Sequence, residues 1–138
     1  MVEVTIRGKQ FPLCLTVAAL DKINEKCGSI AHIGEFLNGY PGKGEDADLN
    51  ASSRAAVNCG WMLGVLIQEG EENRLVEARF AGEPTERRAV PGAEDLAHLL
   101  TPGMEKHYRV AVWRAVNESL KQTVEAENPK NVQEAGQR

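Results

Sequence analysis

The first residues of the chain alternate apolar and polar side chains in two short runs separated by Gly8-Lys9, and the apolar positions are Val2, Val4, Ile6, Phe11, Leu13 and Leu15. A period of two is typical of β-strands. Pairing the runs about Gly8-Lys9 sets Ile6 opposite Phe11 and places the apolar side chains on one face. Because proline has no N–H, Pro12 favours a four-residue loop, 7–10, over a two-residue turn. We therefore predict a β-hairpin within residues 2–15.

A helical period follows the hairpin. Thr16 can cap a first helix that Gly28 ends, and the apolar face of this helix carries Val17, Leu20, Ile23, Asn24 and Cys27. Ser29 can cap a second, short helix that ends at Asn38-Gly39. Residues 39–50 are rich in glycine and acidic side chains, which predicts a loop.

The next segment, capped by Asn50 or Ser52, is apolar on nearly every face as far as Glu69. Such a pattern predicts a central, buried helix. Gly60 and Gly64 lie four residues apart in it, and we expect this strip of small residues to allow close packing inside the monomer. A further helical pattern covers residues 71–80 and ends at Gly82 and Pro84.

The last part of the chain begins with a linker, "PTERRAVP". A short helix then starts at Pro91 or Gly92, and Thr101-Pro102 is a cap followed by a first-turn proline, which predicts a new helix. That helix has apolar residues at every fourth position from Met104 to Val124, with Trp113 beside them. Residues 126–138 are too polar to fold, so we expect a disordered tail.

These elements predict a mainly α fold with a small N-terminal β-hairpin (α+β), forming one compact helical domain over residues 1–125. The aromatic content is only 5%, so the core should be aliphatic. The net charge of −4 arises within residues 68–95. A basic stripe that could neutralise phosphates is missing from the sequence, which argues against nucleic-acid binding.

The expected location is the cytoplasm. The scattered cysteines Cys14, Cys27 and Cys59 are typical of reduced thiols rather than of a disulfide scaffold. The start of the chain lacks the apolar core of a signal peptide, and the longest apolar stretch, 55–67, is too short to cross a bilayer.

The sequence contains several candidate catalytic groups, but none has the spacing or setting that a catalytic site needs. Cys27 and His32 are separated by a helix stop at Gly28, and His98 and His107 lie on either side of another break. The carboxylates Glu69, Glu71 and Glu72 are expected on a solvated surface rather than in an apolar pocket that would raise a pKa. We therefore predict no enzyme activity, no catalytic residue, no metal and no cofactor.

The order of elements suggests a family. The chain opens with a G-K hairpin followed by a helix of the A-L-x-x-I/L-x-x-x-x-G type, starting "AALDKINEKCG" at Ala18. A central apolar helix, "AAVNCGWMLGVLIQEG", comes next, and the "DLAHLLTP" break of residues 95–102 leads into the last amphipathic helix. Over residues 2–125 this arrangement resembles the tail assembly chaperones of long-tailed bacteriophages and prophages.

The resemblance implies a small helical chaperone of the bacterial host cytoplasm that is absent from the mature virion. Its partners would be the tape-measure protein, which it would hold, and the tail-tube protein, whose polymerisation it would assist. Members of this family also tend to self-associate into homo-oligomers. The family has no catalytic motif, so the resemblance transfers no site residue, cofactor or metal.

Holding a helix-rich client requires an exposed apolar surface. We expect a groove between the apolar helices 51–69 and 103–124, with the acidic segment 68–95 beside it. The expected contact residues are Trp61, Leu66, Tyr108, Val112, Trp113 and Val116.

Alternative functions remain open at the level of sequence. One is another small phage morphogenesis protein, such as a head–tail connector. A second is a nucleic-acid-binding regulator that uses Arg109, Arg114 and Lys121 on the last helix, although the net charge opposes it. A third is an enzyme with a diffuse site. We expect neither a membrane nor a nucleic acid among the partners.

Overall fold

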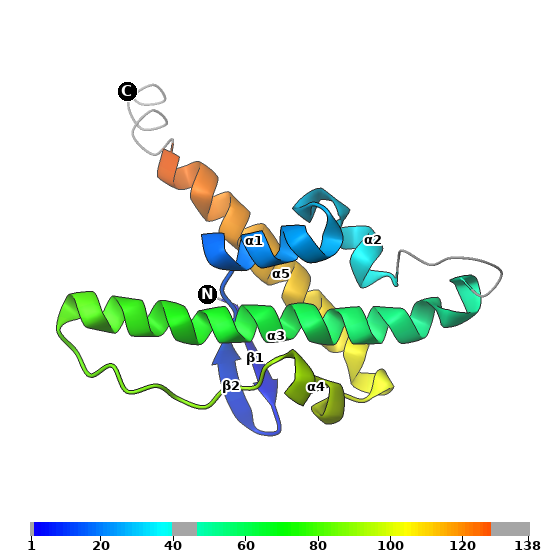
Figure 1. Cartoon of the computed structure of the whole chain (residues 1–138), viewed down its shortest axis with the longest axis horizontal. Helices are drawn as coiled ribbons and strands as arrows, with labels where there is room; N and C mark the ends of the chain where they lie inside the picture. The colour runs from blue at the N-terminus through cyan, green and yellow to red at the C-terminus, as the bar shows by residue number, and fades with distance from the viewer. Residues whose placement is uncertain (1, 40–46, 128–138) are drawn as a thin grey trace.

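The computed structural model of the chain describes residues 2–39 and 47–127. These residues form a two-stranded antiparallel hairpin and five α-helices, which confirms the predicted fold class. One long helix, α3 (Ala47–Ala81), runs through the molecule, and the other elements pack around it (Figure 1).

The hairpin pairs β1 (Glu3–Ile6) with β2 (Lys9–Pro12). Val4 lies opposite Phe11 and Ile6 opposite Lys9, so the expected pairing of Ile6 with Phe11 is wrong by two residues. The turn consists of Arg7 and Gly8, with φ angles of 52° and 82°. Positive φ at both central positions belongs to a primed two-residue turn, whose twist matches that of the strands. The four-residue loop 7–10 is therefore also wrong.

The shift of two residues leaves every side chain on its expected face, because the strand period is two. Val2, Val4, Ile6 and Leu13 are accordingly buried. The Leu13 N–H donates to the Val2 carbonyl at 2.9 Å. Hydrogen-bonded and non-hydrogen-bonded pairs alternate along an antiparallel ladder, so Pro12, opposite Glu3, stands in a non-hydrogen-bonded pair. Its missing N–H leaves no partner unsatisfied there.

Helix α1 (Val17–Cys27) has the predicted ends. The Thr16 hydroxyl accepts a hydrogen bond from the Ala19 N–H at 3.0 Å, and Gly28 takes a φ of 86° at the other end. The buried residues are Ala19 and Ile23, four positions apart. Val17, expected on the buried face, is 85% exposed because it lies outside that stripe.

The predicted second helix is a 3₁₀ turn, η1 (Ile30–His32), followed by α2 (Ile33–Leu37). The Ser29 hydroxyl accepts from the Ala31 N–H at 3.1 Å, as a cap should. Asn58 of α3 donates its amide to the carbonyl of Phe36 at 2.8 Å, which fastens the end of α2 to the long helix.

Helix α3 is continuous over 35 residues, about 52 Å at the usual rise per residue. It begins before Asn50 and Ser52, and it runs beyond the expected end at Glu69, so the helical pattern of residues 71–80 belongs to the same helix. Gly70 serves the close approach of β2, since a Cβ there would overlap the carbonyl oxygen of Pro12. Residues 40–46 of the predicted loop lie outside the described residues.

Beyond α3 the chain turns back beneath the long helix as an extended segment (Figure 1). We call residues 83–92 of this segment the strap. It leads into α4 (Ala93–Leu99), where the Asp95 carboxylate accepts from the Gly92 N–H at 3.1 Å. A Cβ at Gly64 would stand 2.5 Å from the Ala93 nitrogen, which confirms close packing inside the monomer at Gly64.

Helix α5 (Pro102–Glu127) begins at the predicted break. Its last two residues fall in the segment expected to be a tail, and the remainder of that segment, 128–138, lies outside the described residues. The Tyr108 hydroxyl donates to the Thr5 carbonyl at 3.1 Å, which joins α5 to β1.

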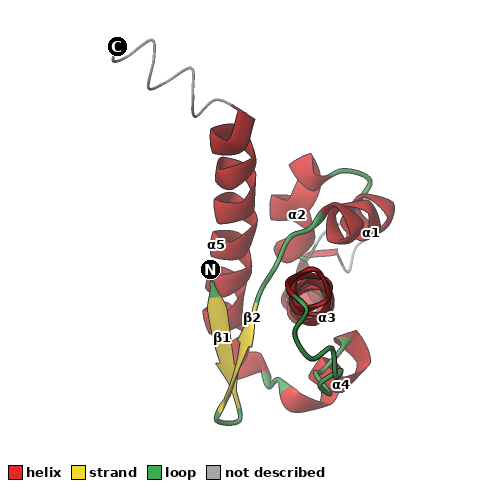
Figure 2. Ribbon diagram, turned by 90° about the vertical axis from the view of Figure 1, so that its left-hand side faces the viewer, coloured by secondary structure: helices red, strands yellow, loops and turns green. Residues whose placement is uncertain are grey.

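Figure 2 looks along α3 and shows it between α1 and α2 on one side and α4 on the other, with α5 and the hairpin closing a third side. The core lies around this axis. Its largest fully buried side chains are aliphatic or sulfur-containing, as the low aromatic content predicts: Ile23, Leu37, Met62, Leu63, Leu66, Ile67, Leu96, Val112, Val116 and Cys59. Among residues 2–39 and 47–127, no helix combines the length with the hydropathy that a membrane crossing needs.

Candidate partner-binding surface

Helices α3 and α5 pack against each other, so their apolar faces fill the space where the sequence suggested a groove. Of the residues expected to contact a partner, those inside this packing are Leu66, Tyr108, Val112 and Val116, all buried. Burial of these faces against each other removes their apolar surface from water within one chain. The expected groove between 51–69 and 103–124 is therefore a core in this structure.

The two tryptophans of the expected surface are half-buried. Trp61 meets Phe36 edge to face with ring centroids 5.8 Å apart, and the Lys26 ammonium lies 5.6 Å from the Trp61 ring centroid. Trp113 packs over Gly34, where a Cβ would be 3.6 Å from its ring atoms. Each tryptophan thus combines a packed edge with an accessible part.

The exposed apolar side chains lie elsewhere. Phe80 is 87% exposed near the end of α3, and Val76, one helical turn before it, is 38% exposed. Residues four apart share a helix face, so the two form one patch, which we call the α3 end patch. The sequence placed Phe80 in a helical pattern but gave no signal that this side chain would be exposed. The other large apolar side chains that are exposed are Val17, Val57, Val110 and Leu120.

The carboxylates at the middle of α3 are not solvated as predicted. Glu69 and Glu71 are only 6% and 5% exposed, although Glu72 is more accessible. Glu69 accepts a hydrogen bond from the Thr16 hydroxyl at 2.5 Å, and the Lys22 ammonium lies 3.8 Å from it. This carboxylate therefore ties the start of α1 to α3.

Glu71 has the strongest set of partners. The Arg74 guanidinium donates twice to it, at 3.0 and 2.7 Å, and the Arg88 main-chain N–H donates at 2.7 Å. The hydrogen bonds from Arg74 are the main reason why the pKa of Glu71 falls to about 2, and they outweigh the opposing effect of burial. The neighbouring Glu72 pairs with Arg87, which lowers the pKa of Glu72.

Two hollows lie along the strap. The larger, about 750 Å3, separates the strap from the end of α3, and its charged lining is Arg74, Glu77, Glu83, Glu86, Arg87 and Arg88. The smaller, about 370 Å3, lies between β2, α3 and the strap and has Phe11 and Ile67 in its wall. A helix with an apolar stripe requires an apolar groove for binding, whereas the wall of the larger hollow contains charged side chains of both signs.

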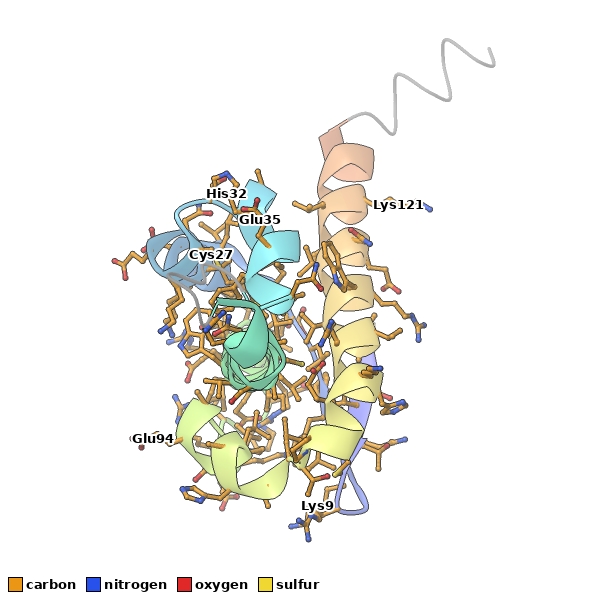
Figure 3. All side chains as sticks on the ribbon, turned by 90° about the vertical axis from the view of Figure 1, so that its right-hand side faces the viewer. Lys9, Cys27, His32, Glu35, Glu94 and Lys121 are labelled. Carbon is orange, nitrogen blue, oxygen red and sulfur yellow. The ribbon has the colours of Figure 1, made fainter. Side chains whose placement is uncertain are left out.

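Catalytic groups do not gather in the part of the chain that the structure describes. Burial raises the pKa of the Cys27 thiol, which disfavours the thiolate that a Cys27–His32 nucleophile would need. His98 belongs to α4 and His107 to α5, and the described residues contain no group of three or more side chains suited to hold a metal. Figure 3 shows His32, Glu94 and Lys121 on separate helices.

The basic residues proposed for nucleic-acid binding, Arg109, Arg114 and Lys121, do not form a single basic surface on α5. Arg109 donates to Glu105 at 2.5 Å and to the Asn38 side chain at 3.2 Å, so its charge is used inside the fold. Arg114 and Lys121 are exposed. This arrangement argues against the hypothesis that α5 is a recognition helix for nucleic acid.

No protein-family model, no curated protein and no solved structure matches this chain.

Proposed function

We propose that this protein is a non-catalytic tail assembly chaperone, which binds the helical tape-measure protein and keeps it soluble while tail-tube subunits polymerise around it. The order of elements supports the proposal, because the hairpin, α1, the central apolar helix and the helix after Pro102 resemble the arrangement expected of that family.

The α3 end patch is the observation that carries the proposal. Phe80 leaves most of its ring in water, and burial of such a side chain against a partner is worth about 2 kcal/mol. A chaperone that binds many places along a long client needs only modest affinity at each one. The patch therefore takes the place of the groove between α3 and α5 as the client-binding surface.

The charge around the patch favours a particular client. The patch lies within residues 68–95, the segment that carries the net negative charge. A client helix with basic residues beside its apolar stripe would be attracted to it, and the remaining acidic surface would keep the complex soluble.

Co-expression with a tape-measure protein tests the proposal. The gene should lie between the tail-tube gene and the longest gene of its cluster, and the product of that longest gene is the client to use. We expect the client to stay soluble and to co-purify with the wild-type chaperone. If the folded wild-type protein neither keeps the client soluble nor co-purifies with it, the proposal is contradicted.

The matched variants are Phe80→Ser and Val110→Ser. Both remove an exposed apolar side chain from a helix, but only Phe80 belongs to the α3 end patch. We expect co-purification to fall with Phe80→Ser and to persist with Val110→Ser.

A further inference from the structure

The strap is attached to α3 through its main chain at alternate residues. The carbonyl of Glu86 accepts from the Arg74 guanidinium at 2.8 Å, and the carbonyl of Val90 accepts from the Gln68 amide at 3.0 Å. Between them, the Arg88 N–H donates to the Glu71 carboxylate at 2.7 Å. One face of α3 thus holds an extended segment by hydrogen bonds that do not depend on the strap's side chains.

Glu71 stands at the centre of this attachment. Its carboxylate binds the strap directly and also holds the guanidinium of Arg74, which reaches Glu86. Removal of its charge would weaken both connections. The pair between Glu72 and Arg87 adds to them, but Arg87 and Glu72 have side chains 59% and 44% exposed, and exposed pairs contribute little.

Apolar packing does little to hold the strap. Residues 83–89 are exposed, and the larger hollow separates the strap from α3 beside Ala78 and Ala81. The buried core lies instead around the middle of α3, where it meets α4 and α5. Val90, near the far end of the strap, packs against that core, but residues 83–89 can detach without exposing it, which is the condition for opening of a local segment.

We propose that the strap is an openable segment with Glu71 as its latch. When the latch is released, residues 83–89 lift from α3 and uncover a face of the helix that includes Ala78, while Val90 stays packed against the core. α3, α4 and α5 keep their packing. This inference is independent of the proposed function.

Tryptic cleavage after Arg88 measures the opening. The main chain at this position is bonded to α3, so cleavage requires the strap to lift. We expect Glu71→Gln to raise the rate of cleavage between Arg88 and Ala89 about tenfold, because it removes a charged acceptor. Mass spectrometry identifies the cut, and circular dichroism reports whether the helices persist.

Glu77→Gln is the matched control, since Glu77 lies on α3 and lines the larger hollow. Its neutralisation leaves intact the hydrogen bonds that Gln68 and Arg74 donate to the strap and the one that Glu71 accepts from it. Cleavage after Arg88 should match the wild-type rate in this variant. Equal rates in the wild type, Glu71→Gln and Glu77→Gln would overturn the proposal.

Hydrogen exchange of the wild-type protein gives a test that does not depend on the variant folding. We expect the Arg88 amide to exchange faster than the most protected amides near Leu63 and Leu66. Exchange of those core amides requires global unfolding. Exchange of the Arg88 amide at the same rate as those core amides would show that the strap opens only when the protein unfolds, and the proposal would be wrong.

Discussion

Gly70 of α3 lies against Pro12 of the hairpin so closely that a Cβ at position 70 would overlap the Pro12 carbonyl oxygen. Just beyond this contact the Cys14 N–H donates to the Leu66 carbonyl at 3.2 Å. The end of the hairpin therefore crosses the long helix at Gly70, a position that has no side chain. The glycine is needed for this crossing.

Gly70→Ala should destabilise the fold. Alanine improves helix propensity by about 1 kcal/mol, but forcing the two backbones apart costs about 1–3 kcal/mol or more, and the overlap with a main-chain oxygen places the cost at the upper end. We expect a net loss of about 2 kcal/mol in the free energy of unfolding, measured by urea denaturation.

Gly103→Ala is the control for this substitution. Gly103 lies in the first turn of α5, and a Cβ there would meet nothing within 4 Å. It should leave the free energy of unfolding unchanged or raise it slightly. A neutral Gly70→Ala would contradict the account of the crossing.

Acid should weaken the protein through Glu71. Its pKa is about 2 in the folded chain against an ordinary value of 4.5, so its ionised form is favoured by folding. The resulting stability is present above about pH 4.5 and is lost as the pH falls towards 2, by up to about 3 kcal/mol. Urea denaturation at a series of pH values gives the free energy of unfolding. Between about pH 4.5 and 2 this free energy should fall less steeply with pH in Glu71→Gln than in the wild type. Identical slopes would mean that the pKa of Glu71 is not lowered by folding.

Arg109→Met should be far more damaging than Arg114→Met. Arg109 is the partner of Glu105, which is only 6% exposed, whereas Arg114 is exposed on the same helix. Loss of Arg109 leaves a buried carboxylate without its cation, which costs about 3 kcal/mol. Thermal and urea denaturation give the difference in the free energy of unfolding between the two variants. This difference measures the contribution of the ion pair between Arg109 and Glu105. Equal effects would show that Glu105 does not depend on Arg109.

Cys59 should resist alkylation in the folded protein. It is fully buried, and burial raises the pKa of its thiol to about 12, with the charge of Glu105 as a smaller cause. Cys14 and Cys27 are partly accessible. Iodoacetamide followed by peptide mass mapping should therefore modify Cys59 last, at the rate of global unfolding. Modification of Cys59 as fast as Cys14 would indicate that the core around α3 opens locally.

Local signals in the sequence predicted most elements of the fold. The caps Thr16 and Ser29, the stop at Gly28 and the Thr101-Pro102 break each act over a few residues, and each lies where expected. The errors concern contacts between distant segments. The hairpin register was open to a shift of two residues because both alternatives bury the same side chains. Nothing in the sequence indicated that Pro12 would lie against Gly70.

The surface was harder to predict than the fold. Periodicity shows which residues share a helix face, but not whether another helix covers that face. Val112 and Phe80 are both apolar residues in helical patterns, yet Val112 is fully buried and Phe80 is 87% exposed. Glu71 was expected on a solvated surface, whereas its burial and its contact with Arg88 depend on the return of the strap along α3.

Fluorescence anisotropy measures the affinity of the purified chain for the tape-measure protein of its own gene cluster, and it tests whether the α3 end patch binds this client. We expect the wild type and Val110→Ser to bind alike and Phe80→Ser to bind about tenfold more weakly or worse, because the ring can no longer be buried against the client. Absence of binding by the folded wild type, or equal binding by Phe80→Ser, would contradict the proposed function.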